Sequence, residues 1–254
     1  GVVFLWCGMA LLLAALMFWV LSLLRNDVSI VDSLWSLMFL LVAVLYAAVS
    51  SHTGQREVLV LVMVSAWTLR LSVYITLRNH GQPEDYRYQE IRANNQPHFR
   101  YKSLYKIFIL QALLAWVISM PLAIAIGASS AIGFLDYAGI ALFVIGFSFE
   151  ALGDLQLSRF RKDPNNVGKV LSSGLWRFTR HPNYFGNFLI WWGFYLVALS
   201  GGGWWSIVSP LLMTFLLLKV SGVALLEKDI AERRPQYRDY VRRTNAFFPG
   251  LPRK

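Results

Sequence analysis

The sequence predicts an all-α integral membrane protein with seven transmembrane helices, an N-terminus outside and a C-terminus in the cytoplasm. Two observations favour this class. The chain has 254 residues, of which 56% are hydrophobic and only 15% are charged, whereas soluble domains carry about 25% charged residues. Apolar runs of about 20 residues, long enough to cross a bilayer as helices, recur along the chain. These features exclude a disordered chain, a coiled coil and an ordinary soluble enzyme.

Seven apolar segments are predicted to span the membrane. The first carries no charge and lacks the basic start and small-residue cleavage site of a signal peptide, so we expect it to be retained. The connections on one side are short, while those on the other hold nearly all the polar residues, so residues 1–254 are predicted to form one domain. The predicted spans are residues 2–24, 33–51, 58–77, 107–126, 132–152, 184–200 and 204–226.

Basic residues are unevenly distributed between the two sides of the predicted membrane. Of the 24 Lys and Arg residues, 21 follow the first, third, fifth and seventh spans, and only Arg56 lies in a connection on the opposite side. Cytoplasmic loops carry such an excess, so these segments are predicted to be cytoplasmic. Topology and the anion pocket described below account for the net charge of +10, so no nucleic acid partner is expected. The four His residues are scattered, and no metal site is expected.

An arginine lies within the third predicted span. In a helix, Trp67, Arg70 and Tyr74 share one face, which presents an aromatic plane, a cation and a phenol. An ionisable group inside a membrane is a candidate functional residue. The alternative is that Arg70 extends to the cytoplasmic interface, but its distance from Leu77, roughly 10 Å at 1.5 Å per residue, favours a ligand-binding role.

Three carboxylates lie at or near the ends of spans. Glu150 and Asp154 share one helix face, where they either accept hydrogen bonds from ribose hydroxyls or an amide, or pair with Arg159, Arg161 or another cation of the loop. Asp32 begins the second span and is either a first-turn acid matched to the helix dipole or a protonated donor.

The segment 173–184 is predicted to bind an anion. Pro182 suits the first turn of a helix, whose free N–H groups attract phosphate or carboxylate, and Arg177, Arg180 and His181 precede it. A basic patch that faces anionic lipid headgroups is the alternative. The basic and aromatic tail, residues 233–243, is predicted to close over the ligand, with a solvated tail as the alternative.

Four stretches resemble the membrane-embedded steroid 5-alpha-reductase superfamily, in its bacterial branch. They are GLWRFTRHPNYFGNFLIWWGFYL, RLSVYITLRNHGQP, DLQLSRFRKDP and LLEKDIAERRPQYRDYV. The resemblance runs from about Asp32 to the end and is strongest over residues 146–254. The Arg-His-Pro-x-Tyr core is also found in isoprenylcysteine carboxyl methyltransferases and related membrane methyltransferases.

The resemblance implies an NADPH-dependent reductase that acts on the double bond of a 3-oxo-Δ4-steroid or a similar enone entering from the bilayer. The family's substrate-carbonyl pair, Glu and Tyr, corresponds here to Asp32 and Trp67. We expect Asp32, Trp35 and Trp67 to contact the substrate, with Asp32 as the hydrogen-bond donor and Tyr74 as a helper. Trp67 offers no phenol, which leaves the proton source and a steroid as the natural substrate open. The expected cofactor residues are Arg70, Tyr74, Asn79, Asp154, Leu157, Arg161, Arg177, Arg180, His181, Asn183, Tyr184, Glu227, Arg234, Tyr237 and Tyr240.

Two other functions remain open at this stage. One is an S-adenosylmethionine-dependent methyltransferase that acts on an isoprenylcysteine or lipid substrate, which needs fewer cations because its cofactor carries no phosphate. The other is a non-catalytic scaffold or lipid-binding protein. For the reductase, we expect a monomer among the lipids of a bacterial inner membrane, with its cofactor site facing the cytoplasm.

Overall fold

The computed structural model describes residues 2–50, 54–220, 223 and 236–253. Every regular element in this part of the chain is helical and no strand occurs there, which confirms the all-α class. Five helical stretches are long and apolar enough to cross a membrane, as expected of a multi-pass membrane protein. They are Val2–Arg25, Ile30–Val49, Gln55–Asn79, Phe99–Gly127 and Phe134–Lys162.

The sixth and seventh predicted spans are not among these five. The helix α9 (Pro182–Ser200) has 19 residues and carries Asn183 and Asn187 near its start. The last apolar helix, Trp204–Val220, is shorter, and most of the rest of that predicted span lies outside the described residues. Seven spans and their orientation therefore stay predictions.

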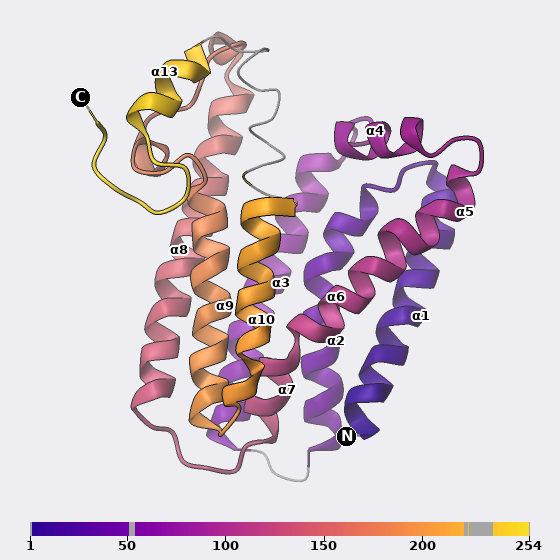
Figure 1. Ribbon diagram of the computed structural model, residues 1–254, viewed down its shortest axis with the longest axis vertical. Helices are drawn as coiled ribbons and strands as arrows, with labels where there is room; N and C mark the ends of the chain where they lie inside the picture. Colours follow the sequence, from indigo (N-terminus) through magenta and orange to yellow (C-terminus); the bar gives the residue numbers. More distant parts are fainter. Residues whose placement is uncertain (1, 51–53, 221–222, 224–235, 254) are drawn as a thin grey trace. The chain divides into compact units, whose positions relative to one another are not determined.

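The chain folds into two compact units, and Figure 1 shows the helices of which they consist. The first comprises Gly1–Ile132 with Ala198–Gly203, and the second comprises Gly133–Val197 with Trp204–Lys254. In the first unit, α2 (Ile30–Val49) packs against both α1 (Val2–Arg25) and α3 (Gln55–Asn79). The connection from α1 to α2 begins at Asn26, which adopts a positive φ of 51°, a conformation that Asn tolerates at the end of a helix.

The rest of the first unit consists of shorter helices. α4 (Tyr86–Asn94) is followed by α5 (Phe99–Ser103), the π-helix η1 (Leu104–Ile109), α6 (Leu110–Ile118) and α7 (Met120–Gly127). The break between α6 and α7 coincides with Pro121 in the first turn of α7, where proline lacks the N–H that a continuous helix needs. At the predicted outer end, the buried Arg56 donates hydrogen bonds to the backbone oxygens of Ser130 and Ala131 at 3.0 and 2.8 Å.

Close backbone packing joins the two long helices of the second unit, α8 (Phe134–Lys162) and α9. A Cβ placed on Gly146 would lie 2.5 Å from the Gly186 carbonyl oxygen, and one on Gly139 would lie 2.7 Å from that of Gly193. The glycines recur every seven residues on each helix, so they form a stripe along which no side chain separates the backbones. This packing sets the register of the polar residues farther along both helices.

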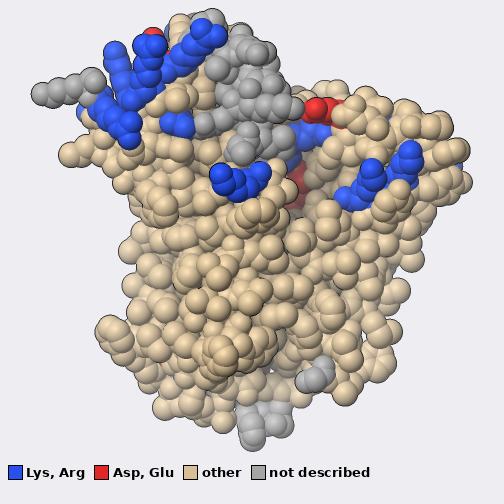
Figure 2. Space-filling model, in the orientation of Figure 1, with Lys and Arg blue, Asp and Glu red and all other residues tan. Residues whose placement is uncertain are grey.

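The remaining elements of the second unit are short. They are the 3-10 helices η2 (Pro164–Asn166), η3 (Gly174–Arg177) and η4 (Trp204–Ile207), the helix α10 (Val208–Phe215), the π-helix η5 (Leu216–Val220) and the terminal helix α13 (Gln236–Arg243). On the face shown in Figure 2, charged side chains of the first unit gather near α4 and α5, and those of the second unit gather near α13. The sides of the long helices present uncharged residues there, as contact with lipid requires.

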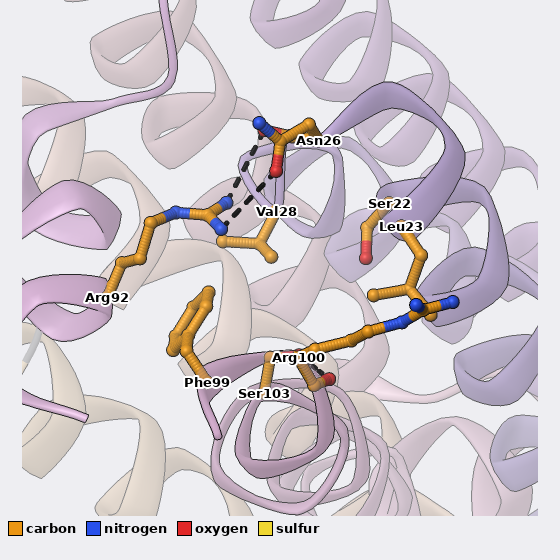
Figure 3. A pocket seen from close by; sticks show the side chains of 8 residues that line it. All are labelled: Ser22, Leu23, Asn26, Val28, Arg92, Phe99, Arg100 and Ser103. Atoms are coloured by element: carbon orange, nitrogen blue, oxygen red, sulfur yellow. Dashed lines mark hydrogen bonds between the residues drawn. The ribbon is translucent and has the colours of Figure 1, made fainter. Parts of the chain in front are cut away.

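The first unit also encloses a cavity of about 260 Å³ beside the end of α1 (Figure 3). Its lining comes from the last turn of α1, the following connection, α4 and α5. None of the predicted site residues lines it.

Candidate functional site

Two buried carboxylates of α8 contact two asparagines of α9. Asn187 Nδ2 donates a hydrogen bond to Glu150 Oε1 at 3.2 Å, and Asn183 Nδ2 donates one to Asp154 Oδ1 at 3.2 Å. Glu150 and Asp154 are only 4% and 5% exposed. With His181, these four residues form what we call the α9 cluster. It brings together the predicted Asp154, His181 and Asn183.

The first turn of α9 begins at Pro182, as predicted. Its backbone N–H groups carry the positive end of the helix dipole, and a Cβ on Gly153 would lie 3.2 Å from the Asn183 nitrogen. The Asp154 carboxylate therefore sits where the dipole stabilises negative charge. The His181 ring is buried and stacks on Tyr184, with ring centroids 5.7 Å apart and planes 8° from parallel.

The Arg180 guanidinium binds the C-terminal segment. Its Nη1 donates to the Thr244 carbonyl oxygen at 2.6 Å and to that of Val241 at 3.2 Å, and the Arg180 backbone N–H donates to Asn245 at 2.9 Å. These carbonyls lie at or just beyond the end of α13, where a cation satisfies acceptors that the helix leaves open. From the sequence we predict that Arg180 binds phosphate. The sequence did not indicate that Arg180 holds the C-terminal segment in place.

The tail is anchored to the segment before α9 by further contacts. The Tyr240 phenol donates to the Trp176 carbonyl oxygen, the Trp176 indole donates to that of Gly153 at 3.1 Å, and Thr179 Oγ1 donates to that of Phe247 at 2.8 Å. Tyr240 and Tyr237 are both buried. These contacts tie the tail to the loop and, through Trp176, to α8. The predicted residues Glu227 and Arg234 lie outside the described residues.

The other predicted cofactor residues of the second unit lie close in the sequence to members of the α9 cluster. Arg161 near the end of α8 and Arg177 in η3 are exposed, while Leu157 is half-buried. Gly174 holds η3 against α8 through a positive φ of 60°, and the following Leu175 N–H donates to Gln156 Oε1 at 3.0 Å.

In the first unit, Trp67 belongs to the packed core. It is fully buried, and its ring centroid lies 5.7 Å from that of Phe39, which in turn lies 5.2 Å from that of the half-buried Trp35. The two predicted substrate residues Trp35 and Trp67 are thus linked through one aromatic neighbour.

The rest of the polar face of α3 is partly covered. Two guanidinium nitrogens of Arg70, Nε and Nη2, are buried, so they do not reach water at the interface. Arg78 lies over the Tyr74 ring at 5.9 Å and donates to Asn79 Oδ1 at 3.0 Å. The predicted residues of α3 therefore differ in burial, with Trp67 innermost.

Asp32 lies at the centre of a cluster of polar side chains that the sequence did not predict. Its Oδ2 lies 2.7 Å from Arg87 Nη2, and its Oδ1 accepts a hydrogen bond of 2.5 Å from the Tyr88 phenol. Arg87 Nε also contacts Asp85 Oδ1 at 2.9 Å. We call these four residues the Asp32 cluster. The helix α4 supplies Arg87 and Tyr88, so the cluster joins residues far apart in the sequence.

Burial and charge within the Asp32 cluster favour a neutral Tyr88 phenol. Burial, and then the neighbouring Asp32 charge, raise the pKa of Tyr88 well above its ordinary value. Burial alone would lower the pKa of Arg87, but Asp32 and Asp85 raise it. Within this cluster the Tyr88 O–H is the donor and Asp32 the acceptor, and Asp32 as the donor to a substrate stays a prediction.

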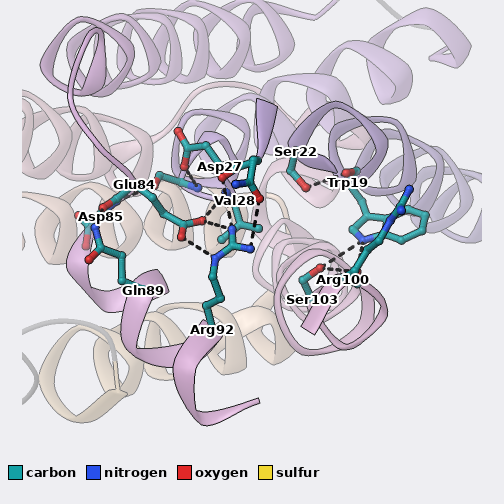
Figure 4. A network of polar contacts seen from close by, with 12 residues as sticks. Trp19, Ser22, Asp27, Val28, Glu84, Asp85, Gln89, Arg92, Arg100 and Ser103 are labelled. Carbon is teal, nitrogen blue, oxygen red and sulfur yellow. Dashed lines mark hydrogen bonds and ion pairs between the residues drawn. The ribbon is translucent and has the colours of Figure 1, made fainter. Parts of the chain in front are cut away.

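A third ion pair holds the segment before α4 against the connection from α1 to α2 (Figure 4). Glu84 Oε1 lies 2.7 Å from Arg92 Nη2 and also accepts a hydrogen bond of 2.9 Å from the Val28 N–H. Beside it, the Ser29 hydroxyl accepts a hydrogen bond of 2.8 Å from the Asp85 N–H. These contacts fix α4 over the start of α2 and so position Tyr88 at Asp32.

The helices and the buried polar groups define the class: an all-helical, multi-pass membrane protein. The chain belongs to a particular family of that class, because residues 18–244 match the family model described as "Protein of unknown function (DUF1295)", a family of steroid 5-alpha-reductase-like membrane proteins. It is similar to "Uncharacterized protein C594.04c" of Schizosaccharomyces pombe. The two are 28% identical over an alignment of 271 residues, gaps included, which covers 92% of this chain and 76% of the relative. No solved structure matches the chain.

Proposed function

We propose that the protein reduces the C4–C5 double bond of a 3-oxo-Δ4-steroid, or the double bond of a similar lipophilic enone, with NADPH as the reductant. The observation that carries this proposal is the α9 cluster, where buried carboxylates and a stacked His–Tyr pair meet at the start of a helix. Membership in a family of steroid 5-alpha-reductase-like membrane proteins supports it.

The α9 cluster suits the nucleoside part of a dinucleotide. Glu150 and Asp154 offer acceptors for ribose hydroxyls, and the stacked rings of His181 and Tyr184 offer a flat apolar surface for a base. For phosphates, the exposed Arg161 and Arg177 are the proposed partners, since Arg180 is engaged by the tail. Arg70, Tyr74 and Asn79 of the first unit are proposed as cofactor residues on the family resemblance.

The proposed chemistry is hydride addition followed by protonation. When bound, NADPH would supply a hydride for the β-carbon of the enone. Negative charge then develops on the carbonyl oxygen, where a hydrogen-bond donor lowers the barrier. We assign this donor to Tyr88, whose one O–H, donated to Asp32 in the structure, would turn to the carbonyl oxygen when the substrate binds. Its high pKa suits Tyr88 to donate a hydrogen bond rather than a proton, so the proton that reaches the α-carbon comes from water.

A methyltransferase that uses S-adenosylmethionine is the second candidate function. One observation favours it: the Arg180 guanidinium is bound to carbonyl oxygens of the tail, which leaves fewer cations for phosphates near α9. The carboxylates of the α9 cluster would suit the ribose of either cofactor.

The proposed location is a bacterial inner membrane. There the protein would act as a monomer, with its N-terminus outside and its cofactor-binding side facing the cytoplasm. The excess of basic residues in the predicted cytoplasmic segments supports this orientation.

Cofactor binding followed by turnover tests the proposal. Protein purified in a non-ionic detergent is titrated with NADPH, NADH and S-adenosylmethionine, and is then incubated with the preferred cofactor and a panel of steroid and lipid enones. Saturable NADPH binding, with NADPH oxidation and a product two mass units heavier, is the expected result. Selective binding of S-adenosylmethionine would establish the second candidate, and binding of neither would favour a non-catalytic protein.

A further inference from the structure

The cavity beside the end of α1 has a polar rim and an apolar wall. Its volume of about 260 Å³ is below the roughly 300–1,000 Å³ of pockets that enclose drug-sized ligands, so it suits a small polar group whose remainder lies outside. The cavity is lined by Ser22, Leu23, Asn26, Val28, Arg92, Phe99, Arg100 and Ser103.

One of the two arginines at this cavity has its charge balanced. Arg92 contacts Glu84 at 2.7 Å and lies over the Phe99 ring at 4.6 Å. The side chain of Arg100 extends across the cavity to a position beside Leu23 (Figure 3). Arg100 is exposed, and its guanidinium forms no hydrogen bond or ion pair within the described residues. It therefore leaves an uncompensated positive charge at the cavity.

The position of Arg100 is fixed through its backbone. The Trp19 indole of α1 donates to the Arg100 carbonyl oxygen at 3.1 Å and to Ser103 Oγ at 3.2 Å. Tryptophan is enriched at the level of lipid headgroups, and Tyr101 beside Arg100 is 64% exposed. These residues place the cavity at the depth of the membrane interface.

A second hollow lies on α1, one to two turns closer to the middle of the predicted span. It is wholly apolar and is lined by Leu16, Met17, Val20, Leu21 and Leu24. In a helix, Leu16, Val20 and Leu23 lie on one face. Val20 lines the hollow and Leu23 lines the polar cavity, and residues three apart in a helix are neighbours, so the two adjoin at this pair, with the Arg100 guanidinium beside Leu23.

We propose that the cavity binds the headgroup of an anionic phospholipid. The Arg100 guanidinium and the Asn26 amide would bind the phosphate, and the acyl chains would follow the apolar hollow of α1. Charge complementarity identifies the occupant: the cavity has a free cation at its rim and adjoins an apolar surface, a combination that fits a ligand with one phosphate and long hydrocarbon chains. The proposal is independent of the reductase function.

Native mass spectrometry of the full chain in a non-ionic detergent tests this site. The protein is titrated with dioleoyl phosphatidylglycerol, with phosphatidylcholine of the same chains, and with glycerol 1-phosphate. Phosphatidylglycerol should bind about tenfold more tightly than phosphatidylcholine, because the choline cation offsets the phosphate charge that attracts Arg100. If millimolar glycerol 1-phosphate binds as tightly as phosphatidylglycerol, the site is one for free phosphate compounds and the lipid proposal is wrong.

Three variants separate the cavity from general membrane electrostatics. Arg100→Gln should weaken phosphatidylglycerol binding about tenfold. Arg25→Gln removes an equal charge from an exposed residue at the same end of α1, outside the cavity lining, and should leave binding within about twofold. Leu23→Trp fills the cavity without changing the charge and should weaken binding as Arg100→Gln does. Equal losses in Arg25→Gln and Arg100→Gln, or full binding by Leu23→Trp, would overturn the proposal.

Discussion

The Tyr88 phenol donates a hydrogen bond of 2.5 Å to Oδ1 of Asp32, whose other oxygen contacts Arg87 at 2.7 Å. This arrangement makes Asp32 an acceptor and Tyr88 the donor. It also supplies a phenol for the proposed reductase reaction, although Trp67 lies at the position where the family that the sequence resembles has tyrosine.

Tyr88→Phe removes this donor and little else. If Tyr88 stabilises the developing enolate, turnover of the enone should fall about 100-fold or more, while NADPH binding stays close to that of the unchanged protein. Steady-state oxidation of NADPH measures the first, and calorimetric titration measures the second. Tyr86→Phe is the matched control, because Tyr86 lies on the same helix but is 43% exposed. Equal turnover by the two variants would show that Tyr88 is only structural.

The ion pair between Asp85 and Arg87 should make the free energy of unfolding depend on pH in the acidic range. Burial alone would raise the pKa of Asp85, but the hydrogen bonds and charge of Arg87 lower it below its ordinary value. A carboxyl whose pKa is lower in the folded protein contributes stability above its unfolded pKa, about 4, and loses this contribution as the pH falls through the folded value. Melting temperatures measured from pH 6 to pH 3 should therefore fall less steeply for Asp85→Asn. Asp239→Asn, at a side chain that is 73% exposed, should follow the unchanged protein, and parallel curves for all three would contradict the account.

Sequence patterns predicted the elements better than the contacts between them. Apolar length and the low share of charged residues predicted the helical class, and Pro182 correctly marked the start of α9. The pairing of Asp32 with Tyr88 was missed because 56 positions separate the two residues, and no local pattern indicates which loop residue will reach a helix start. The structural role of Arg180 was missed for the same reason, since its acceptors are backbone oxygens about 60 residues away.

The structural role of Arg180 predicts that its loss releases the C-terminal segment. Arg180→Ala leaves the carbonyl oxygens of Val241 and Thr244 without this donor, at an expected cost of about 3–6 kcal/mol for the two charge-assisted bonds. Limited proteolysis should therefore cut the tail of this variant faster. Arg177→Ala removes an exposed arginine of the same loop and should be cut at the original rate. Equal resistance of the two variants would show that the tail is held in place without Arg180.

Close packing of α8 on α9 predicts a strong effect from a single methyl group. A Cβ on Gly146 would lie 2.5 Å from the Gly186 oxygen, whereas one on Gly127 would meet nothing within 4 Å. Gly146→Ala should lower the melting temperature because the rigid backbones must separate. Gly127→Ala should melt at or above the original temperature. A Gly146→Ala variant that melts with the unchanged protein would show that the two helices can part freely.

The central claim is that the α9 cluster binds a nucleotide, and calorimetric titration with NADPH in detergent tests it most directly. The unchanged protein should bind NADPH saturably. Asp154→Asn should bind about tenfold more weakly, because a hydrogen bond to a charged acceptor is lost, while Asp239→Asn should bind normally. The absence of NADPH binding by the folded protein, or equal affinity in both variants, would contradict the account.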